Sequence, residues 1–274
     1  PLSGLSALPS YGKSRIDGAR PADLMAASVD IDADANGDGR LDLVLGVPGT
    51  SNVFNEDRSG AYVVFGASTG WLVDLSALGE RGFRIGGAHL PEMGGATVSA
   101  AGDVNDDGLA DVIVGKQYAD ANARVDAGSA YVVFGKASTS PVDLGALGSG
   151  GFRIDGETAG GRAGYSVTGV GDVNNDGFSD VLVGAPYAGS QSGAAYVVFG
   201  SAAPGNVDLA ALDQRGFRIV AAHSFGRLGA SGARVGDING DGFADLIVGA
   251  PSSPTCTCAW VVFGTAGMAP VNLG

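Results

Sequence analysis

Short apolar runs separated by glycine-rich polar turns make up most of the chain. Residues 180–185 and 194–200 are almost continuously apolar and rich in Val, as expected for strands that are covered on both faces. No segment keeps a 3.6-residue apolar period over the length of a helix. The best helical candidates, residues 74–78, 143–147 and 208–212, are long enough for one turn at most. The pattern therefore predicts an all-β protein.

The pattern recurs four times. Tyr-Val-Val-Phe-Gly occupies residues 62–66, 131–135 and 196–200 and returns with Trp at 260–264, while Gly-Phe-Arg-Ile occupies 82–85, 151–154 and 216–219, with a degraded copy at 13–16. The distance along the chain from one copy to the next, as from residue 62 to residue 131, leaves room for about four strands per repeat. We expect a β-propeller of four-stranded antiparallel blades. It forms a single domain over residues 1–274, with repeats at about 19–85, 86–154, 155–219 and 220–274.

The third repeat illustrates the expected blade. Its strands A to D are predicted at residues 166–171, 180–185, 194–200 and 217–220, with a longer link through 207–209 before strand D. The last repeat stops at 271–273 without a strand D, and the chain begins with a similar piece at 15–18. Residues 1–18 are therefore predicted to complete the last blade and close a ring, within one chain or between chains.

An acidic nine-residue motif stands between strands A and B of every repeat. It has Asp at positions 1, 5 and 9, Asn at position 3 and Gly at position 6. Hard oxygen ligands at this spacing suit Ca²⁺, and the glycine permits the sharp turn that folds them inward. We expect about four Ca²⁺ ions, bound by Asp34, Asn36, Asp38, Arg40 and Asp42; Asp103, Asn105, Asp107, Leu109 and Asp111; Asp172, Asn174, Asp176, Phe178 and Asp180; and Asp237, Asn239, Asp241, Phe243 and Asp245.

The motif also resembles an EF-hand loop and a polar turn without metal. An EF-hand needs a Glu at position 12 and flanking helices. Position 12 is instead Leu45, Val114, Val183 or Val248, each inside a strand-like run. An EF-hand is therefore rejected, whereas a polar turn without metal stays open.

The motifs resemble those of the FG-GAP repeat family. The fourth repeat has Phe225-Gly226 before strand A and Gly249-Ala250-Pro251 after strand B, and the third has Gly164-Tyr165 and 184–186 in the same places. The second repeat departs from the pattern, with Gly-Lys-Gln at 115–117. The family includes the propellers of integrin α subunits, glycosylphosphatidylinositol-specific phospholipase D and bacterial surface proteins. The resemblance implies that each acidic loop is a Ca²⁺-binding A–B hairpin. Integrin-type propellers have seven blades, so a longer propeller, a four-blade ring and half of an eight-blade dimer all stay open.

The charge and hydropathy of the chain limit the classes of function that it can have. The chain has 29 Asp and Glu against 16 Lys and Arg, a net charge of −13, and positions 1, 5 and 9 of the four motifs hold 12 of these acids. Ca²⁺ is expected to stabilise the native state by binding to it. No basic stripe suggests nucleic-acid binding, and no run of 18 apolar residues suggests a membrane span. Loops of this kind suit extracellular Ca²⁺ concentrations, which favours a secreted or cell-surface protein.

Few residues outside the loops suggest chemistry. His89 and His223 occupy equivalent D–A loops, and Trp71 is a candidate sugar platform. The repeated arginines Arg15, Arg84, Arg153 and Arg218 are expected to cap a blade edge or pair with a nearby acid. For Cys256 and Cys258, free thiols, a local or intermolecular disulfide and a soft-metal pair all stay open. Because no nucleophile motif is evident, no catalytic residue is predicted.

Three functions follow from these observations. The first is a non-enzymatic binding or adhesion module that holds a protein or glycan ligand on the face built from the B–C loops (about 48–59, 116–127, 186–192 and 251–258) and the D–A loops, called the B–C face below. These loops vary between repeats, and variable loops on a rigid scaffold often carry recognition. The second is a subunit of a larger surface assembly, a homo-oligomer completed by strand exchange. The third is an accessory domain of a secreted hydrolase.

Overall fold

Val-rich runs form the inner strands of the blades. The structure is a computed structural model that describes residues 15–19, 28–47, 60–68, 72–87, 96–221, 226–252, 258–267 and 269–274. Strand β13 (Asp180–Ala185) is buried along its whole length, and so is β14 (Ala194–Val198). Neighbouring blades cover both of their faces, which explains the absence of a polar alternation. The all-β prediction is confirmed.

Each blade is built from antiparallel strands in chain order. Three blades have strands A to D, and the fourth has three strands among the described residues. Blade 1 contains β2 (Ser28–Ala33), β3 (Asp42–Val47), β4 (Gly60–Val64) and β6 (Gly82–Gly86); blade 2 contains β7 (Ala96–Gly102), β8 (Asp111–Lys116), β9 (Ser129–Val133) and β11 (Gly151–Asp155); blade 3 contains β12 (Ser166–Gly171), β13, β14 and β16 (Gly216–Val220); blade 4 contains β17 (Ser231–Gly236), β18 (Asp245–Ala250) and β19 (Cys258–Val262).

In the described segments the helices are limited to single turns. The predicted turns appear as the 3₁₀ helices η2 (Leu75–Ala77), η4 (Leu144–Ala146) and η5 (Leu209–Ala211), and η3 (Gly79–Arg81) and η6 (Asp213–Arg215) precede strands D. The four-residue α1 (Ala188–Gln191) lies in the B–C loop of blade 3. Asp74, Asp143 and Asp208 each cap one of the first three turns through a side-chain oxygen. Among the described residues no helix is long and apolar enough to cross a membrane.

A short parallel strand adds a fifth member to the sheets. β10 (Val142–Asp143) pairs with β6, β15 (Val207–Asp208) with β11, and β20 (Val271–Asn272) with β16. Each of these strands comes from the repeat that follows the blade it joins. Consecutive blades are therefore tied together by backbone hydrogen bonds as well as by side-chain packing.

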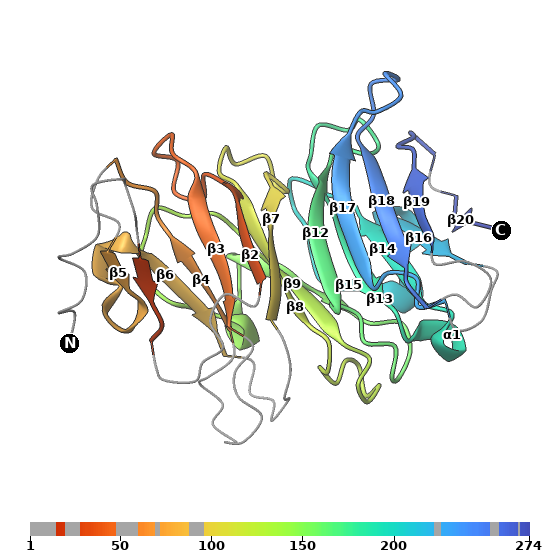
Figure 1. Ribbon diagram of the computed structural model, residues 1–274, viewed down its shortest axis with the longest axis horizontal. Coiled ribbons are helices and arrows are strands. Elements are labelled where there is room, and N and C mark those ends of the chain that lie inside the picture. The colour runs from red at the N-terminus through yellow and green to blue at the C-terminus, as the bar shows by residue number, and fades with distance from the viewer. Residues whose placement is uncertain are drawn as a thin grey trace.

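The N-terminal strand does not take the place predicted for it. β1 (Arg15–Asp17) pairs with β5 (Leu72–Asp74), in the same parallel manner as the other fifth strands. Figure 1 accordingly shows β1 beside β5 at one end of the row of blades and β19 at the other end. Among the described residues β1 is not paired with β19, so the predicted completion of the last blade is not seen, and residues 1–14 lie outside the described part of the chain. The reason is local, because Arg15–Asp17 is a strand D and every Val-Asp-Leu or Val-Asn-Leu piece pairs with the strand D before it.

Side chains alternate between the two faces of each blade and fill the space between blades. Val197 and Phe217 of blade 3 pack with Leu246 and Val248 of blade 4 in one apolar cluster. The innermost strands A lie side by side in the order β2, β7, β12, β17. The repeated Tyr is part of this core, since Tyr131 and Tyr196 are almost fully buried and pack in apolar clusters.

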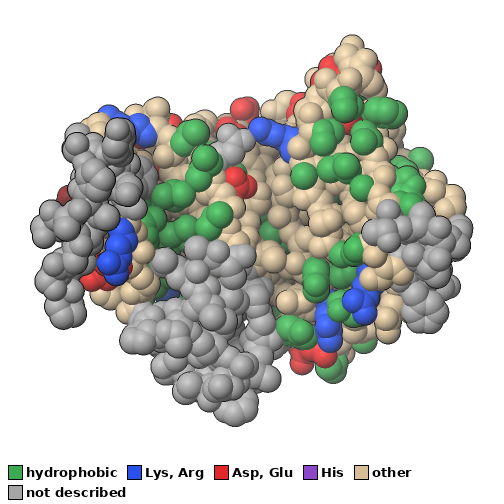
Figure 2. All heavy atoms as spheres, in the orientation of Figure 1, with side chains coloured by type: hydrophobic (Ala, Val, Ile, Leu, Met, Phe, Trp, Pro, Cys, Tyr) green, Lys and Arg blue, Asp and Glu red, His purple; other side chains and the backbone are tan. Residues whose placement is uncertain are grey.

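The outer face of blade 4 remains exposed. Val261 and Phe263 are 39% and 54% exposed, whereas their equivalents in blade 3, Val197 and Phe199, are 0% and 5% exposed. Figure 2 shows further hydrophobic side chains on the surface over β2 and β3 and over β17 and β18. The face that a following blade would cover therefore stays apolar and open to solvent in this structure.

Candidate metal centres

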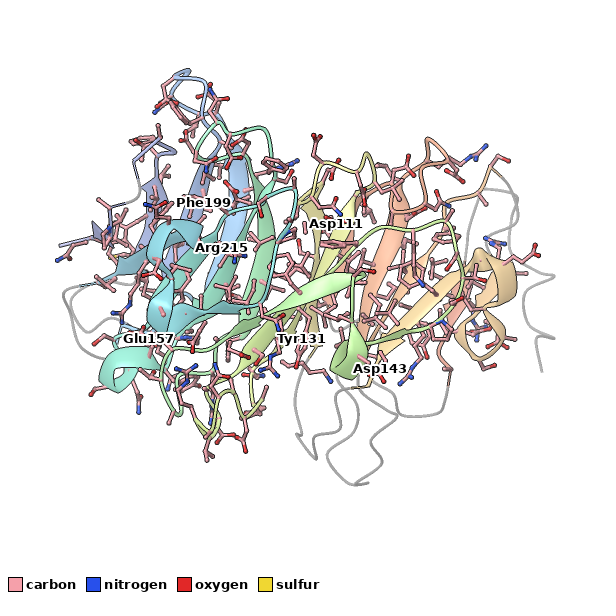
Figure 3. The ribbon with its side chains drawn as sticks, turned by 180° about the vertical axis from the view of Figure 1, so that it is seen from behind. Asp111, Tyr131, Asp143, Glu157, Phe199 and Arg215 are labelled. Atoms are coloured by element: carbon pink, nitrogen blue, oxygen red, sulfur yellow. The ribbon has the colours of Figure 1, made fainter. Side chains whose placement is uncertain are left out.

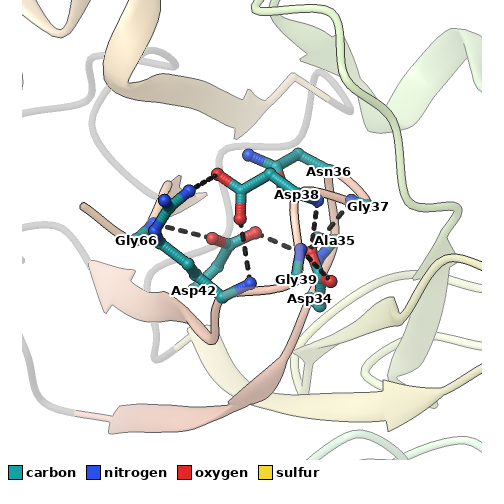
Figure 4. Close-up of polar contacts among 9 residues, drawn as sticks. Asp34, Ala35, Asn36, Gly37, Asp38, Gly39, Asp42 and Gly66 are labelled. Carbon is teal, nitrogen blue, oxygen red and sulfur yellow. Dashed lines mark hydrogen bonds and ion pairs between the residues drawn. The ribbon is translucent and has the colours of Figure 1, made fainter. Parts of the chain in front are cut away.

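The first acidic loop is organised around the carboxylate of Asp34. Its two oxygens accept hydrogen bonds from the backbone N–H groups of Gly37, Asp38 and Gly39 at 2.8 to 3.1 Å (Figure 4). The side-chain oxygen of Asn36 accepts from the N–H of Asp38 at 2.9 Å. The side-chain oxygens of Asp and Asn accept the N–H groups that point into this turn and so stabilise it, which explains why Asp and Asn occupy positions 1 and 3.

The same bonds recur in the other three loops. The N–H of the glycine at position 6 donates to the Asp at position 1 at 2.8 Å in the second and third loops and at 2.9 Å in the fourth. The N–H at position 7 donates to the Asp at position 5 in all four. The four loops therefore share one backbone conformation, and a bulge in strand A precedes each of them.

The Asp at position 9 has a separate structural role. It is fully buried in every repeat, as Asp42, Asp111, Asp180 and Asp245. In the third repeat one oxygen of Asp180 accepts from the N–H of Val173 at 2.8 Å, and the other accepts from the N–H of Gly200 at 2.9 Å. This carboxylate thus ties the acidic loop to the end of strand C, a contact that the sequence spacing did not indicate.

Burial raises the pKa of three of these carboxyl groups, those of Asp42, Asp111 and Asp180. It raises the pKa of Asp111 to about 7 and that of Asp180 to about 8, although two backbone N–H groups oppose the shift at each site. The pKa of Asp42 is also raised, mainly by burial. The nearby acids at positions 1 and 5 add to the shift in each case. A bound cation would offset this cost, because it favours the ionised form.

Hydrogen bonds also join each acidic loop to the next. The carbonyl of Asp34 accepts from the N–H of Ala110 at 3.0 Å, that of Asp103 from Ser179 at 2.9 Å, and that of Asp172 from Ala244 at 3.0 Å. The donor is position 8 of the following loop in each case. The loops therefore form a continuous line along one face of the blades, called the A–B face below. Figure 3 shows Asp111 toward this edge and Glu157 toward the opposite one.

The oxygen donors fit Ca²⁺ in kind. Each loop offers carboxylates, one amide oxygen and the backbone carbonyl of position 7, with no imidazole or thiolate. Among the described residues, however, no group of three or more Asp, Glu, His or Cys side chains is arranged around one point as a metal cluster. The carboxylates instead face their own backbone N–H groups. The structure thus brings each predicted ligand set onto one loop without gathering its carboxylates.

Two side-chain contacts occupy ligand oxygens. In three loops the amide of the Asn donates to the Asp at position 5, as from Asn174 to Asp176 at 2.8 Å. In the first loop Arg40 contacts Asp38 at 3.2 Å. A bound metal ion would have to displace these donors from the Asp oxygens or share the oxygens with them. Arg40 is the one cationic residue at position 7, where the other loops have Leu109, Phe178 and Phe243.

The other residues singled out from the sequence have mixed outcomes. Arg15, Arg153 and Arg218 contact Asp17, Asp155 and Glu157, respectively, which confirms the expected pairing with nearby acids. Cys258 is disulfide-bonded. His89, His223, Trp71 and Cys256 lie outside the described residues. Sequence reasoning missed a group of stacked arginines and tyrosines on the B–C face, because its members come from different repeats.

Comparison with known proteins identifies the repeat. The FG-GAP repeat family matches residues 94–133, 163–198 and 229–267. The chain is 30% identical to integrin alpha pat-2 of Caenorhabditis elegans over 257 residues, which are 88% of this chain and 18% of the relative. It is 34% identical to integrin alpha-PS5 of Drosophila melanogaster over 182 residues, 61% of this chain and 16% of the relative.

A second group of relatives is enzymatic by name. The chain is 33% identical to phosphatidylinositol-glycan-specific phospholipase D of Bos taurus over 175 residues, 59% of this chain and 19% of the relative. The chain spans less than a fifth of the length of each of these relatives.

Proposed function

From the premise that this chain belongs to the FG-GAP repeat family, we propose that it is a non-enzymatic, Ca²⁺-stabilised binding module that acts outside the cell and holds its ligand on the B–C face. The integrin α relatives support an adhesion-type propeller module. No catalytic residue is assigned. The phospholipase relatives support one alternative, an accessory domain of a secreted hydrolase.

The repeated geometry of the acidic loops carries the Ca²⁺ part of the proposal. Four loops share the same hydrogen bonds around the same oxygen donors, and their backbones are linked from blade to blade. Ions bound there would neutralise the carboxylates of each loop and strengthen the line of loops. Such ions would stabilise the folded chain, because the unfolded chain has no preformed site.

The contrast between the two faces supports the ligand part. The A–B face repeats one loop four times, whereas the B–C loops differ. In blade 2 the loop contains a turn at Ala121 and Arg124, and Arg124 pairs with Asp208 at 2.7 Å. In blade 3 the loop is shorter and contains α1. A rigid scaffold that varies on one face is suited to recognition there.

Loop replacement tests the ligand face. The wild-type chain would be screened against an array of extracellular matrix proteins and glycans in millimolar Ca²⁺. One variant replaces residues 119–127 with a Gly-Ser segment of equal length, and a control variant does the same at residues 201–206 near the A–B face. Interactions should be lost in the first variant and kept in the control. Interactions that survive every B–C replacement would exclude this face.

A second candidate function is assembly with another copy of the chain. The exposed Val261 and Phe263 are equivalent to residues that the next blade buries in blade 3. Among the described residues no strand pairs with the free edge of β19. A second copy carries the matching elements, since its β1 is a strand D and its blade 1 offers the near face of a blade. Light scattering tests this directly, because a monomer at every concentration excludes it.

A further inference from the structure

Two arginines and two tyrosines stack on the B–C face across three blades. The guanidinium of Arg162 lies 4.7 Å from the ring centroid of Tyr118 and 4.4 Å from that of Tyr187. The guanidinium of Arg227 lies 5.1 Å from the centroid of Tyr187. Tyr165 packs edge-on against Tyr187, with the ring centroids 6.1 Å apart. These five residues, called the Arg–Tyr ladder below, come from the B–C loops of blades 2 and 3 and the D–A loops that lead to blades 3 and 4.

The two arginines occupy equivalent positions in their repeats and have the same backbone conformation. Arg162 and Arg227 each precede strand A of their repeat by the same interval, and both adopt a left-handed conformation, with φ of 56° and 54°. Such a conformation is uncommon for a residue other than glycine and often marks a functional position. The backbone N–H of Arg162 donates to the backbone carbonyl of Asp126 and that of Arg227 to the carbonyl of Gln191, each in the preceding B–C loop. The side chains are therefore presented by anchored loops.

The two guanidinium groups have no acidic partner in the part of the chain that the structure describes. Among the described residues, neither Arg162 nor Arg227 forms a side-chain hydrogen bond or ion pair. Arg124, Arg153 and Arg218, by contrast, each contact a carboxylate on the same side of the molecule. Both free groups lie within 5.1 Å of one ring centroid, so two like charges are held close together without neutralisation. Stacking leaves the N–H edges of each guanidinium available for a ligand.

We propose that the Arg–Tyr ladder binds carboxylate groups of an extended, acidic polypeptide segment. This inference rests on the proposed function and names the ligand chemistry for the B–C face. A guanidinium fork donates two parallel hydrogen bonds to a carboxylate, and the phenol groups add donors beside it. Acidic side chains at alternate positions of an extended segment point to the same side about 7 Å apart, so one segment can present two acids to the same surface. Tyr and Arg are also the residues that dominate binding energy in protein interfaces.

The ladder favours a peptide over a glycan. A sugar ring binds an aromatic platform through the open face of the ring, yet guanidinium groups already stack on Tyr118 and Tyr187. What remains accessible is charge and hydrogen-bond donors. Figure 2 shows basic side chains interspersed with hydrophobic ones on the lower edge of the molecule, between the ends of β8 and α1. The overall charge of −13 would repel an acidic peptide, so any binding must come from a local site.

The test measures binding of a fluorescein-labelled peptide of alternating Glu and Thr to the full chain by fluorescence anisotropy, in Ca²⁺ and at low salt. The double variant Arg162→Asn with Arg227→Asn removes both charges and suits the left-handed backbone. It should bind at least about tenfold more weakly, since charge-assisted bonds are lost. Arg162→Lys with Arg227→Lys keeps the charge but loses the fork. Its affinity for the peptide should lie between those of the wild type and the double Asn variant. Arg215→Asn, near the A–B face, should bind like the wild type.

Three results would overturn the proposal. They are no peptide binding by the wild type, equal binding by the double Asn variant, and Arg-dependent binding of polygalacturonate without peptide binding. An unchanged melting temperature in the Asn variant shows that weaker binding does not come from misfolding. The loop-replacement screen remains independent, because it maps any ligand to the B–C face whether or not these arginines contribute. Failure of the acidic-peptide inference is therefore distinguishable from failure of the binding module.

Discussion

The carboxylate of Asp180 accepts a hydrogen bond from the backbone N–H of Gly200, which lies 20 residues further along the chain, at 2.9 Å. Equivalent bonds join Asp42 to Gly66, Asp111 to Gly135 and Asp245 to Gly264. The last acid of each loop is thus a structural link between the loop and strand C. The acidic motif therefore serves the fold in addition to any metal that it binds.

Replacing Asp180 with Ala should destabilise the chain even in the presence of chelator. The substitution leaves the buried N–H groups of Val173 and Gly200 without an acceptor. We expect a loss of about 2–4 kcal/mol in the free energy of unfolding, measured by urea denaturation. Glu80→Ala, at an exposed site, is the control and should change it by less than about 0.5 kcal/mol. Equal effects of both variants would show that Asp180 has no such role.

Gly200 should not tolerate a side chain. A Cβ there would lie 2.5 Å from the carbonyl oxygen of Ser179 and 2.7 Å from that of Val104. Gly200→Ala should therefore cost about 1–3 kcal/mol through backbone displacement. Gly205 is the matched control, because a Cβ there meets nothing within 4 Å. Thermal unfolding of the two variants should separate them clearly, and a harmless Gly200→Ala would contradict the packing described at the end of strand C.

Asp208 should titrate below its ordinary range. Partial burial acts to raise the pKa of Asp208, but the N–H of Ala210 and the side chains of Arg124 and Asn122 outweigh it and hold the pKa below 3.8. The ionised form therefore contributes stability above pH 3.8 that is lost as the pH falls through the lowered value. Arg124→Gln should move the pKa of Asp208 back toward 3.8, as followed by NMR. Because this pair is partly exposed, the change in stability should stay below about 1 kcal/mol.

Self-association should depend on the outer face of blade 4. Val261→Thr combined with Phe263→Ser removes much of the exposed apolar surface of that face. If copies associate there, the molar mass from light scattering should fall to that of one 27.0 kDa chain. Val125→Ser is the control, since Val125 is 64% exposed in the B–C loop of blade 2, away from the outer face of blade 4 and from blade 1. A dimer that persists in the double variant would place the contact elsewhere.

Much of the fold follows from sequence pattern. Strands such as β12 (Ser166–Gly171) and β13 were predicted at the bounds observed, because a repeated apolar run between glycines leaves few other structures. β15 was missed as a strand, since two residues are too few to show a period. The pairing of β1 with β5 was not predicted either, because so short a parallel contact leaves no apolar period in the sequence.

The sequence likewise reveals some of the candidate sites and not others. The acidic loops are local, and their shape depends on residues within nine positions, so the sequence reveals them. The link from Asp180 to Gly200 and the stacking of Arg162 on Tyr118 join residues far apart in the chain. Such contacts depend on how blades pack and on where D–A loops meet B–C loops. Composition and spacing carry no information about them.

Calorimetric titration of the metal-free chain with Ca²⁺, combined with thermal unfolding, tests the central claim most directly. Four acidic loops predict about four ions per chain, and ions that bind only the native state should raise the melting temperature in millimolar Ca²⁺. Asp176→Asn should remove one ion and leave the others, while Mg²⁺ should substitute poorly, since it requires a tighter octahedral shell. Absence of binding heat, with equal melting temperatures in Ca²⁺ and in chelator, would contradict the account and leave the loops as polar turns without metal.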